Sequence, residues 1–108
     1  MQRHHVAGEE ELAGMLGPGQ VRILTAGGVE VGIFRLADGY RAYRNLCPHA
    51  GAPVCTGPVI DAEGRRILVC PWHGWQFDLE TGAMPGAPSN ALESFAVELS
   101  DGQVYIWV

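Results

Sequence analysis

Hydrophobic and polar positions alternate along most of the chain, in short segments that glycine-containing turns separate. Alternation of this kind is typical of strands with one buried face, and it predicts eight strands. They lie near Arg3–Ala7, Val21–Thr25, Val29–Leu36, Tyr40–Asn45, Arg66–Val69, Gln76–Asp78, Phe95–Leu99 and Val104–Val108. Glu9–Met15 predicts one short helical turn, which the following Gly17-Pro18-Gly19 would end. Short strands joined by close turns predict an all-β fold, an antiparallel sandwich or a small barrel.

Length and composition set the scale of the protein. With 108 residues, 47% of them apolar, the chain predicts a single domain over residues 1–108 with a hydrophobic core. No apolar run approaches the roughly 20 residues that cross a bilayer. The segment Met1–Glu11 lacks the apolar stretch of a secretory signal, so we expect a cytoplasmic protein that does not bind membranes.

The charge balance limits the partners. Seven arginines and no lysine stand against twelve acidic residues, which gives a net charge of −5. Nucleic-acid binding depends on basic side chains that neutralise phosphates, so this class of function is excluded. A net acidic surface is instead compatible with docking onto a basic face of another protein.

Two stretches rich in glycine and proline interrupt the alternation, Leu46–Pro58 and Cys70–Trp75. Each carries one cysteine and one histidine close together, with a soft sulfur and a borderline nitrogen. Between the stretches a turn signal predicts a hairpin around Ile60–Arg66, which would bring the two loops together. The candidate metal ligands are Cys47, His49, Cys70 and His73.

The cysteine count restricts the kind of metal site. Three thiols cannot supply a four-cysteine zinc site or an all-cysteine iron–sulfur cluster within one chain, so imidazole ligands are required. A zinc site of two cysteines and two histidines is the alternative, but its ligands usually come as a cysteine pair and a histidine pair rather than as mixed pairs. The third thiol, Cys55, has no evident partner, and we expect it to be a small, semi-buried packing residue.

The motifs Cys47-Pro48-His49-Ala50-Gly51 and Cys-Pro-Trp-His-Gly-Trp-Gln-Phe-Asp, which begins at Cys70, resemble those of Rieske [2Fe–2S] proteins, and the resemblance extends from about Val21 to Val108. It implies a Rieske-type antiparallel β sandwich with two cluster-binding loops. It also implies a [2Fe–2S] cluster with Cys47 and Cys70 on one iron and His49 and His73 on the other. The 20 residues between His49 and Cys70 are more than is usual in this family, which indicates an elongated hairpin.

The resemblance to Rieske ferredoxins implies a soluble one-electron carrier that passes electrons from a flavin-dependent reductase to a terminal oxygenase. We expect a monomer that is not itself an enzyme. Once the cluster ligands are assigned, only the adjacent His4 and His5 remain, too few for the 2-His-1-carboxylate site of an oxygenase in so small a domain. A Gly-x-Gly-x-x-Gly dinucleotide fingerprint is also absent. The alternatives are a non-catalytic small subunit of a larger reductase, such as assimilatory nitrite reductase, and a zinc-stabilised interaction module.

Aromatic side chains surround the second motif. In high-potential relatives a serine and a tyrosine stand at the positions of Trp75 and Phe77, and their hydroxyls bond to the sulfurs of the cluster. Since Trp75 and Phe77 have no hydroxyl, the resemblance implies a low-potential cluster, at about −150 mV. We expect Phe77 in the core and Trp72 partly exposed.

Overall fold

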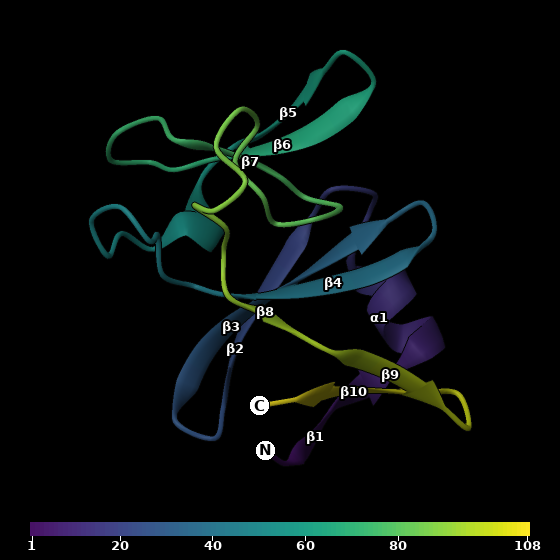
Figure 1. Cartoon of the computed structure of the whole chain (residues 1–108). Coiled ribbons are helices and arrows are strands. Elements are labelled where there is room, and N and C mark those ends of the chain that lie inside the picture. Colours follow the sequence, from purple (N-terminus) through teal and green to yellow (C-terminus); the bar gives the residue numbers. More distant parts are fainter.

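The computed structural model describes the whole chain, residues 1–108 (Figure 1). Its elements are β1 (Arg3–Gly8), α1 (Glu9–Met15), β2 (Val21–Ala26), β3 (Val29–Leu36), β4 (Gly39–Arg44), the 3-10 turn η1 (Val54–Thr56), β5 (Val59–Ala62), β6 (Arg65–Val69), β7 (Gln76–Asp78), β8 (Ser94–Phe95), β9 (Val97–Ser100) and β10 (Gln103–Trp107). The strands form three antiparallel sheets, in the orders β1-β10-β9, β2-β3-β4-β8 and β5-β6-β7. The prediction of an all-β antiparallel fold is therefore confirmed.

One predicted strand is wrong. The expected strand Phe95–Leu99 is two elements: Phe95 ends β8 and is paired with Ala42 of β4, whereas β9 begins at Val97 and pairs with β10. The chain thus passes from one sheet to another at Ala96. Alternation along a strand reports which side chains share a face, but not which neighbour the strand pairs with, so the sequence pattern could not show this transfer.

The hairpin expected around Ile60–Arg66 is confirmed. β5 and β6 are joined by Glu63 and Gly64, whose φ angles are 52° and 78°. Positive φ at both central residues belongs to the type I′ turn, whose twist suits a two-residue hairpin. β7 then pairs with β6, so the segment between Val69 and Gln76 is held at the end of this small sheet.

Two hydrophobic cores lie on opposite faces of the sheet β2-β3-β4-β8. Because successive side chains of a strand point to opposite faces, Ile33 of β3 enters one core and Phe34 enters the other. The core on the Phe34 side contains Cys47 and Cys70, and we call it the ligand-side core. The core on the Ile33 side, the distal core, is closed by the sheet β1-β10-β9 and by Leu12 of α1.

The helix and the chain ends belong to the distal half. Arg35 of β3 caps the carboxyl end of α1, because its Nη1 donates to the carbonyls of Ala13 and Leu16, both at 2.8 Å. The N–H of Gln2 donates to the Val108 carbonyl at 2.8 Å, and the Val108 N–H donates back at 3.0 Å. Both ends therefore lie side by side, well away from the loops on the left of Figure 1. The one helix falls short of the length and apolar content that a membrane-spanning helix needs.

Candidate metal centre

Two loops carry the candidate ligands. The first ligand loop, residues 45–58, joins β4 to β5, and the second ligand loop, residues 70–75, joins β6 to β7. In the first loop the Cys47 N–H donates to the Ala52 carbonyl at 2.8 Å, and the Gly51 N–H donates to the Cys47 carbonyl at 2.9 Å. These two bonds close a turn that starts at the cysteine.

The second ligand loop repeats this pattern. The Cys70 N–H donates to the Trp75 carbonyl at 2.7 Å, and the Gly74 N–H donates to the Cys70 carbonyl at 3.0 Å. In both loops the glycine stands four residues after the cysteine and has a positive φ, 71° at Gly51 and 70° at Gly74. A residue with a Cβ adopts this conformation at a cost, so glycine at these positions permits the two turns.

The two cysteines form a buried sulfur pair. Cys47 and Cys70 are each only 1% exposed, and neither forms a disulfide. Burial raises the pKa of the Cys47 thiol, backbone N–H groups of His49 and Ala50 lower it, and the adjacent Cys70 side chain raises it again. The two sulfurs are therefore neighbours in a dry environment, with backbone donors directed at one of them.

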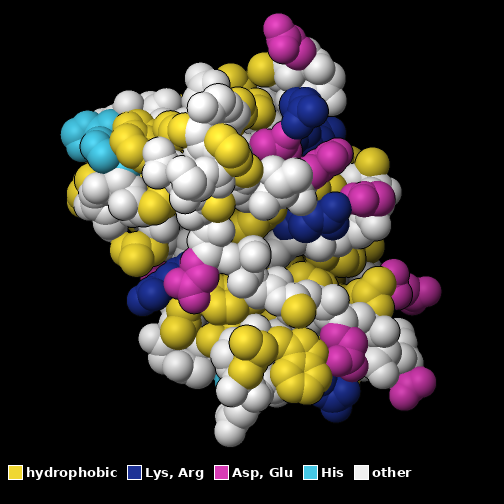
Figure 2. Space-filling view, in the orientation of Figure 1, with side chains coloured by type: hydrophobic (Ala, Val, Ile, Leu, Met, Phe, Trp, Pro, Cys, Tyr) yellow, Lys and Arg dark blue, Asp and Glu magenta, His cyan; other side chains and the backbone are white.

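The two histidines form an exposed imidazole pair beside the sulfurs. The ring centroids of His49 and His73 are 4.9 Å apart, with an interplanar angle of 77°, and both side chains are exposed. Figure 2 shows imidazole surface at the end of the molecule that the two loops form. The loops therefore place the four predicted ligands in two pairs, a buried pair of sulfurs and an exposed pair of imidazoles.

This arrangement fits a diiron cluster. No three His, Cys, Asp or Glu side chains gather around a single point as ligands of one ion, whereas a tetrahedral zinc site places four donors around one ion. A Rieske cluster instead takes two thiolates on one iron and two imidazoles on the other. The donor types and their separation into two pairs suit that group.

Trp75 contributes a contact that the sequence did not predict. Its ring is stacked on His49, with centroids 4.1 Å apart and an angle of 12° between the planes. The indole comes from the second ligand loop and the imidazole from the first, so the contact joins the two loops. The only sequence signal was an aromatic residue two positions after His73, which does not indicate where its ring lies.

Cys55 lies apart from the sulfur pair. It is fully buried, and its backbone N–H donates to Asn45 Oδ1 at 2.8 Å. Its sulfur lies 3.8 Å from the Tyr43 carbonyl, and burial raises the pKa of this thiol to about 12. The expectation of a packing residue is confirmed, but the residue is fully buried rather than semi-buried.

The other residues singled out in the sequence also lie as expected. Phe77 is fully buried, and Trp72 is 59% exposed. His4 and His5 lie on the edge strand β1, where the His5 ring is bonded to Gln103 at 2.7 Å. Neither histidine belongs to the ligand loops.

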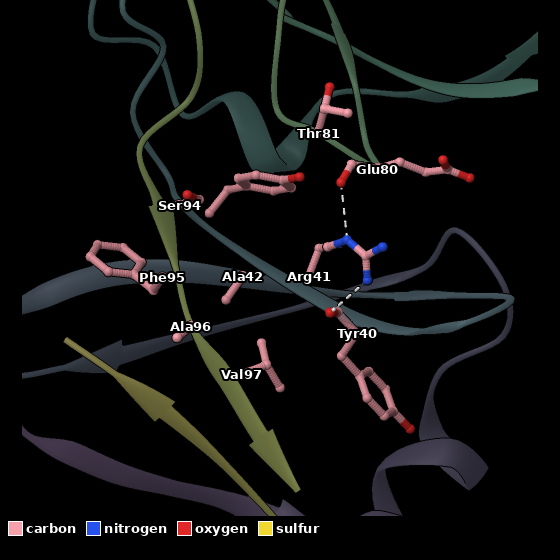
Figure 3. A pocket seen from close by; sticks show the side chains of 10 residues that line it. Tyr40, Arg41, Ala42, Glu80, Thr81, Ser94, Phe95, Ala96 and Val97 are labelled. Carbon is pink, nitrogen blue, oxygen red and sulfur yellow. Dashed lines mark hydrogen bonds between the residues drawn. The ribbon is translucent and has the colours of Figure 1, made fainter.

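The hollows of the molecule lie elsewhere. One of about 410 Å³ is bounded by β4, β8 and the start of β9, with Glu80 at its rim (Figure 3). Arg41 points into it, but its Nε already donates to the Glu80 carbonyl at 3.0 Å and its Nη2 pairs with Asp38 at 3.1 Å. None of the four candidate ligands lines this or any other hollow.

Comparison with known proteins decides the family. The sequence profile described as the Rieske [2Fe-2S] domain matches residues 2–96. The chain belongs to the Rieske [2Fe–2S] family. A [2Fe–2S] cluster is accordingly the cofactor of this domain.

Curated relatives of the Rieske family include both small and large proteins. Ferredoxin CarAc of Metapseudomonas resinovorans is 30% identical over 91 residues, which cover 82% of this chain and 81% of that protein. Human apoptosis-inducing factor 3 is 33% identical over 82% of this chain, but the match spans only 14% of its length. The human Rieske domain-containing protein is likewise matched over 34% of its length.

Solved Rieske structures superimpose on nearly the whole chain. The ferredoxin of carbazole 1,9a-dioxygenase from Nocardioides aromaticivorans IC177 is 26% identical, with a TM-score of 0.74, and the match covers 98% of this chain and 97% of that one. A putative NADH-dependent nitrite reductase small subunit from Mycobacterium tuberculosis is 24% identical, with a TM-score of 0.76. The match covers 97% of this chain and 93% of that subunit. The second likeness shows the shared fold alone.

Proposed function

We propose that this chain is a Rieske-type ferredoxin, a one-electron carrier that accepts an electron from a flavin-dependent reductase and passes it to a terminal oxygenase. The observation that carries the proposal is that the same two loops present an exposed imidazole pair and a buried sulfur pair. Ferredoxins of comparable length among the relatives support it. In this proposal residues 1–108 act as a single Rieske domain.

The four side chains of the two loops are the proposed ligands. Cys47 and Cys70 would hold one iron, and His49 and His73 would hold the other. When bound, the cluster supplies a site that takes up and returns one electron. Neutral imidazoles on one side leave the ligand set two charges less negative than four thiolates, which favours uptake of the electron.

The chain's own groups protect the thiolates. Burial of Cys47 and Cys70 keeps water from both sulfurs, and the backbone N–H groups of His49 and Ala50 stabilise negative charge on the first of them. Hydrogen bonds of this kind adjust the potential at which a site accepts an electron.

The imidazoles provide the route by which the electron would leave the protein. Each histidine would hold iron through one ring nitrogen and would keep the other as an N–H group. Since His49 and His73 are exposed, these ring edges offer a short route from the buried sulfurs to a partner's surface. The stacked Trp75 ring limits rotation of His49 and so holds its edge in place.

The test is the composition and spectrum of purified protein. We expect two iron atoms and two acid-labile sulfides per chain, and an EPR signal after reduction with dithionite. Cys70→Ala should lose the iron, whereas the matched control Cys55→Ala should retain it, because Cys55 lies outside the sulfur pair. Zinc in place of iron, or an unchanged cluster in Cys70→Ala, would refute the assignment.

A second candidate is a small subunit of a larger reductase, because the fold matches that of nitrite reductase small subunits over nearly the whole chain. Gel filtration of a native extract separates the two functions. A freely migrating monomer of 11.6 kDa supports the ferredoxin. Stable co-elution with a large flavoprotein would favour the subunit.

A further inference from the structure

The end of the molecule that carries the imidazole pair has no formal charge. Residues 45–60 and 67–77 include both ligand loops and contain no Asp, Glu, Lys or Arg. Figure 2 shows this end as hydrophobic and uncharged surface around the cyan imidazoles, with most of the acidic and basic side chains of that face gathered on the other side.

Charged residues that flank these segments in sequence are paired. Arg44, just before the first ligand loop, forms an ion pair with Glu93 at 3.3 Å. Asp78, the last residue of β7, has a side chain that is 4% exposed and is paired with Arg65. Opposite charges held together cancel at a distance, so these residues add little field at the loop tips.

The densest group of acids lies at the opposite end. Glu9, Glu10 and Glu11 begin α1, and together with Asp101 they surround a shallow hollow of about 390 Å³. Figure 1 places α1 and the turn between β9 and β10 on the far side of the molecule from the ligand loops. The longest dimension of the protein is 38 Å, against a screening length of about 8 Å at physiological ionic strength. A partner that approaches the imidazoles therefore experiences little of the electrostatic field that the net charge of −5 produces.

Exposed apolar side chains adjoin the proposed ligands in sequence. Trp72, directly before His73, is 59% exposed, and Leu46, directly before Cys47, is 41% exposed. Charged residues are depleted at the centre of protein interfaces, and tryptophan is enriched among the residues that dominate binding.

We propose that the imidazole end docks onto a redox protein through an uncharged, apolar surface that covers the partner's cofactor, rather than onto a basic face. This inference rests on the proposed function. The fitting partner surface has apolar groups to enclose Trp72 and Leu46 and hydrogen-bond acceptors for the imidazole N–H groups of His49 and His73. In the step itself, one electron leaves the reduced chain and reduces the oxidised metal centre of the partner, the proposed terminal oxygenase, and no covalent bond forms or breaks. Binding of this kind is insensitive to salt.

Protein-film voltammetry of the cluster-containing protein tests the partner's chemistry directly. Gold electrodes are coated with alkanethiols of equal length that end in methyl, amine or carboxylate groups. We expect the fastest electron exchange on the methyl surface, with no dependence on NaCl concentration. On the amine surface the protein should bind through the acids around α1, with the imidazoles turned away, so that exchange is slow and binding is lost as salt increases.

Two matched variants test whether Trp72 makes the contact with the apolar surface. Trp72→Ala should lower the amount of redox-active protein on the methyl surface about tenfold, since tenfold corresponds to 1.4 kcal/mol, a typical effect for a dominant tryptophan. Leu99→Ala removes an apolar side chain that is 50% exposed on β9, and it should change nothing. Circular dichroism and the EPR signal confirm that each variant is folded and carries its cluster.

The outcomes separate the two proposals. Fast, salt-sensitive exchange on the amine surface overturns apolar docking, as does equal binding of Trp72→Ala and the unaltered protein. The comparison among surfaces uses the unaltered chain and remains decisive if Trp72→Ala fails to fold. A protein with an EPR-visible cluster that exchanges no electrons on the methyl surface also refutes the docking proposal. A protein that shows no redox cluster by EPR refutes the proposed function instead.

Discussion

Cys55 is as buried as Cys47 and Cys70, yet its sulfur faces the main-chain carbonyls of Tyr43 and Arg44 rather than another thiol. Burial raises the pKa of Cys55 to about 12 from its ordinary value of 9.0. The raised pKa means that the folded protein favours the neutral thiol. At the scale of a single residue, the neighbours and not the depth of burial distinguish a packing cysteine from a candidate ligand.

Cys55 should therefore resist alkylation. At pH 9 about 500-fold less of it is thiolate than of an exposed cysteine, and only the thiolate reacts. We expect iodoacetamide to leave Cys55 unmodified in the folded protein and to modify it in guanidinium chloride, as read by peptide mass spectrometry. Its contribution to stability is complete below pH 9 and is lost as the pH rises towards 12, because only the unfolded chain releases the proton at first. Rapid labelling of the folded protein at this position would contradict the assignment.

Gly32 of β3 makes the room that Cys55 occupies. A Cβ at Gly32 would stand 2.6 Å from the Cys55 sulfur and 2.7 Å from its Cβ. We expect Gly32→Ala to destabilise the protein by about 1–3 kcal/mol, as overpacking in a core does. Gly14 of α1 is the matched control: a Cβ there would meet nothing within 4 Å, so Gly14→Ala should stabilise the helix by about 0.5–1 kcal/mol. Urea denaturation measures both, and equal effects would count against the packing argument.

At the scale of elements, the two ligand loops are held by the end of a small sheet. Gly57 ends η1 at ordinary φ and ψ of −73° and 166°, so an alanine there would face no backbone strain. A Cβ at this position, however, would collide with the backbone carbonyl of Val69, the residue before Cys70. The first ligand loop therefore lies directly on the start of the second.

Gly57→Ala should accordingly push the loops apart. We expect the purified variant to hold much less iron per chain than the unaltered protein, while its far-UV circular dichroism stays close to normal. Gly14→Ala, which adds the same methyl group far from the loops, should keep its full iron content. Iron and acid-labile sulfide analysis gives the answer, and a full cluster in Gly57→Ala would rule out this contact as a determinant of the site.

Alternation and turn chemistry predicted most of these elements. The helix Glu9–Met15 and the strand Val29–Leu36 agree residue for residue, because the Gly-Pro-Gly stop after the helix and the alternation along the strand are local signals. The short turn η1 and the division at Ala96 were missed, since both depend on what the chain packs against. The four candidate ligands could be chosen from the mixed Cys–His pairs. The stacking of Trp75 on His49 could not be predicted from the sequence, because it arises only when two loops distant in sequence meet.

At the scale of the whole molecule, the sheet β2-β3-β4-β8 separates two cores of different composition. The ligand-side core includes Cys47 and Cys70, so part of its stability comes from whatever holds these sulfurs together. The distal core is closed by β10 and α1 and contains none of the proposed ligands. Loss of the cluster should therefore destabilise the half that contains the ligand-side core and leave the distal half stable.

Hydrogen exchange can measure this difference. After removal of the cluster with a chelator under reducing conditions, we expect faster exchange at the amides of Gly51 and Gly74, whose bonds close the ligand loops. Amides of β10, such as those of Val104 and Ile106, should keep their protection because both side chains are fully buried in the distal core. Uniform loss of protection in both halves would mean that the two cores unfold as one cooperative unit.

The pairing of Gln2 with Val108 has a consequence for how this protein can be joined to others. A polypeptide tethered to either terminus would leave from the same place, on the side away from the two ligand loops. Such an attachment leaves the imidazole end unobstructed. The length of the linker, rather than the choice of terminus, would then set how far the imidazole end can reach from the attached polypeptide.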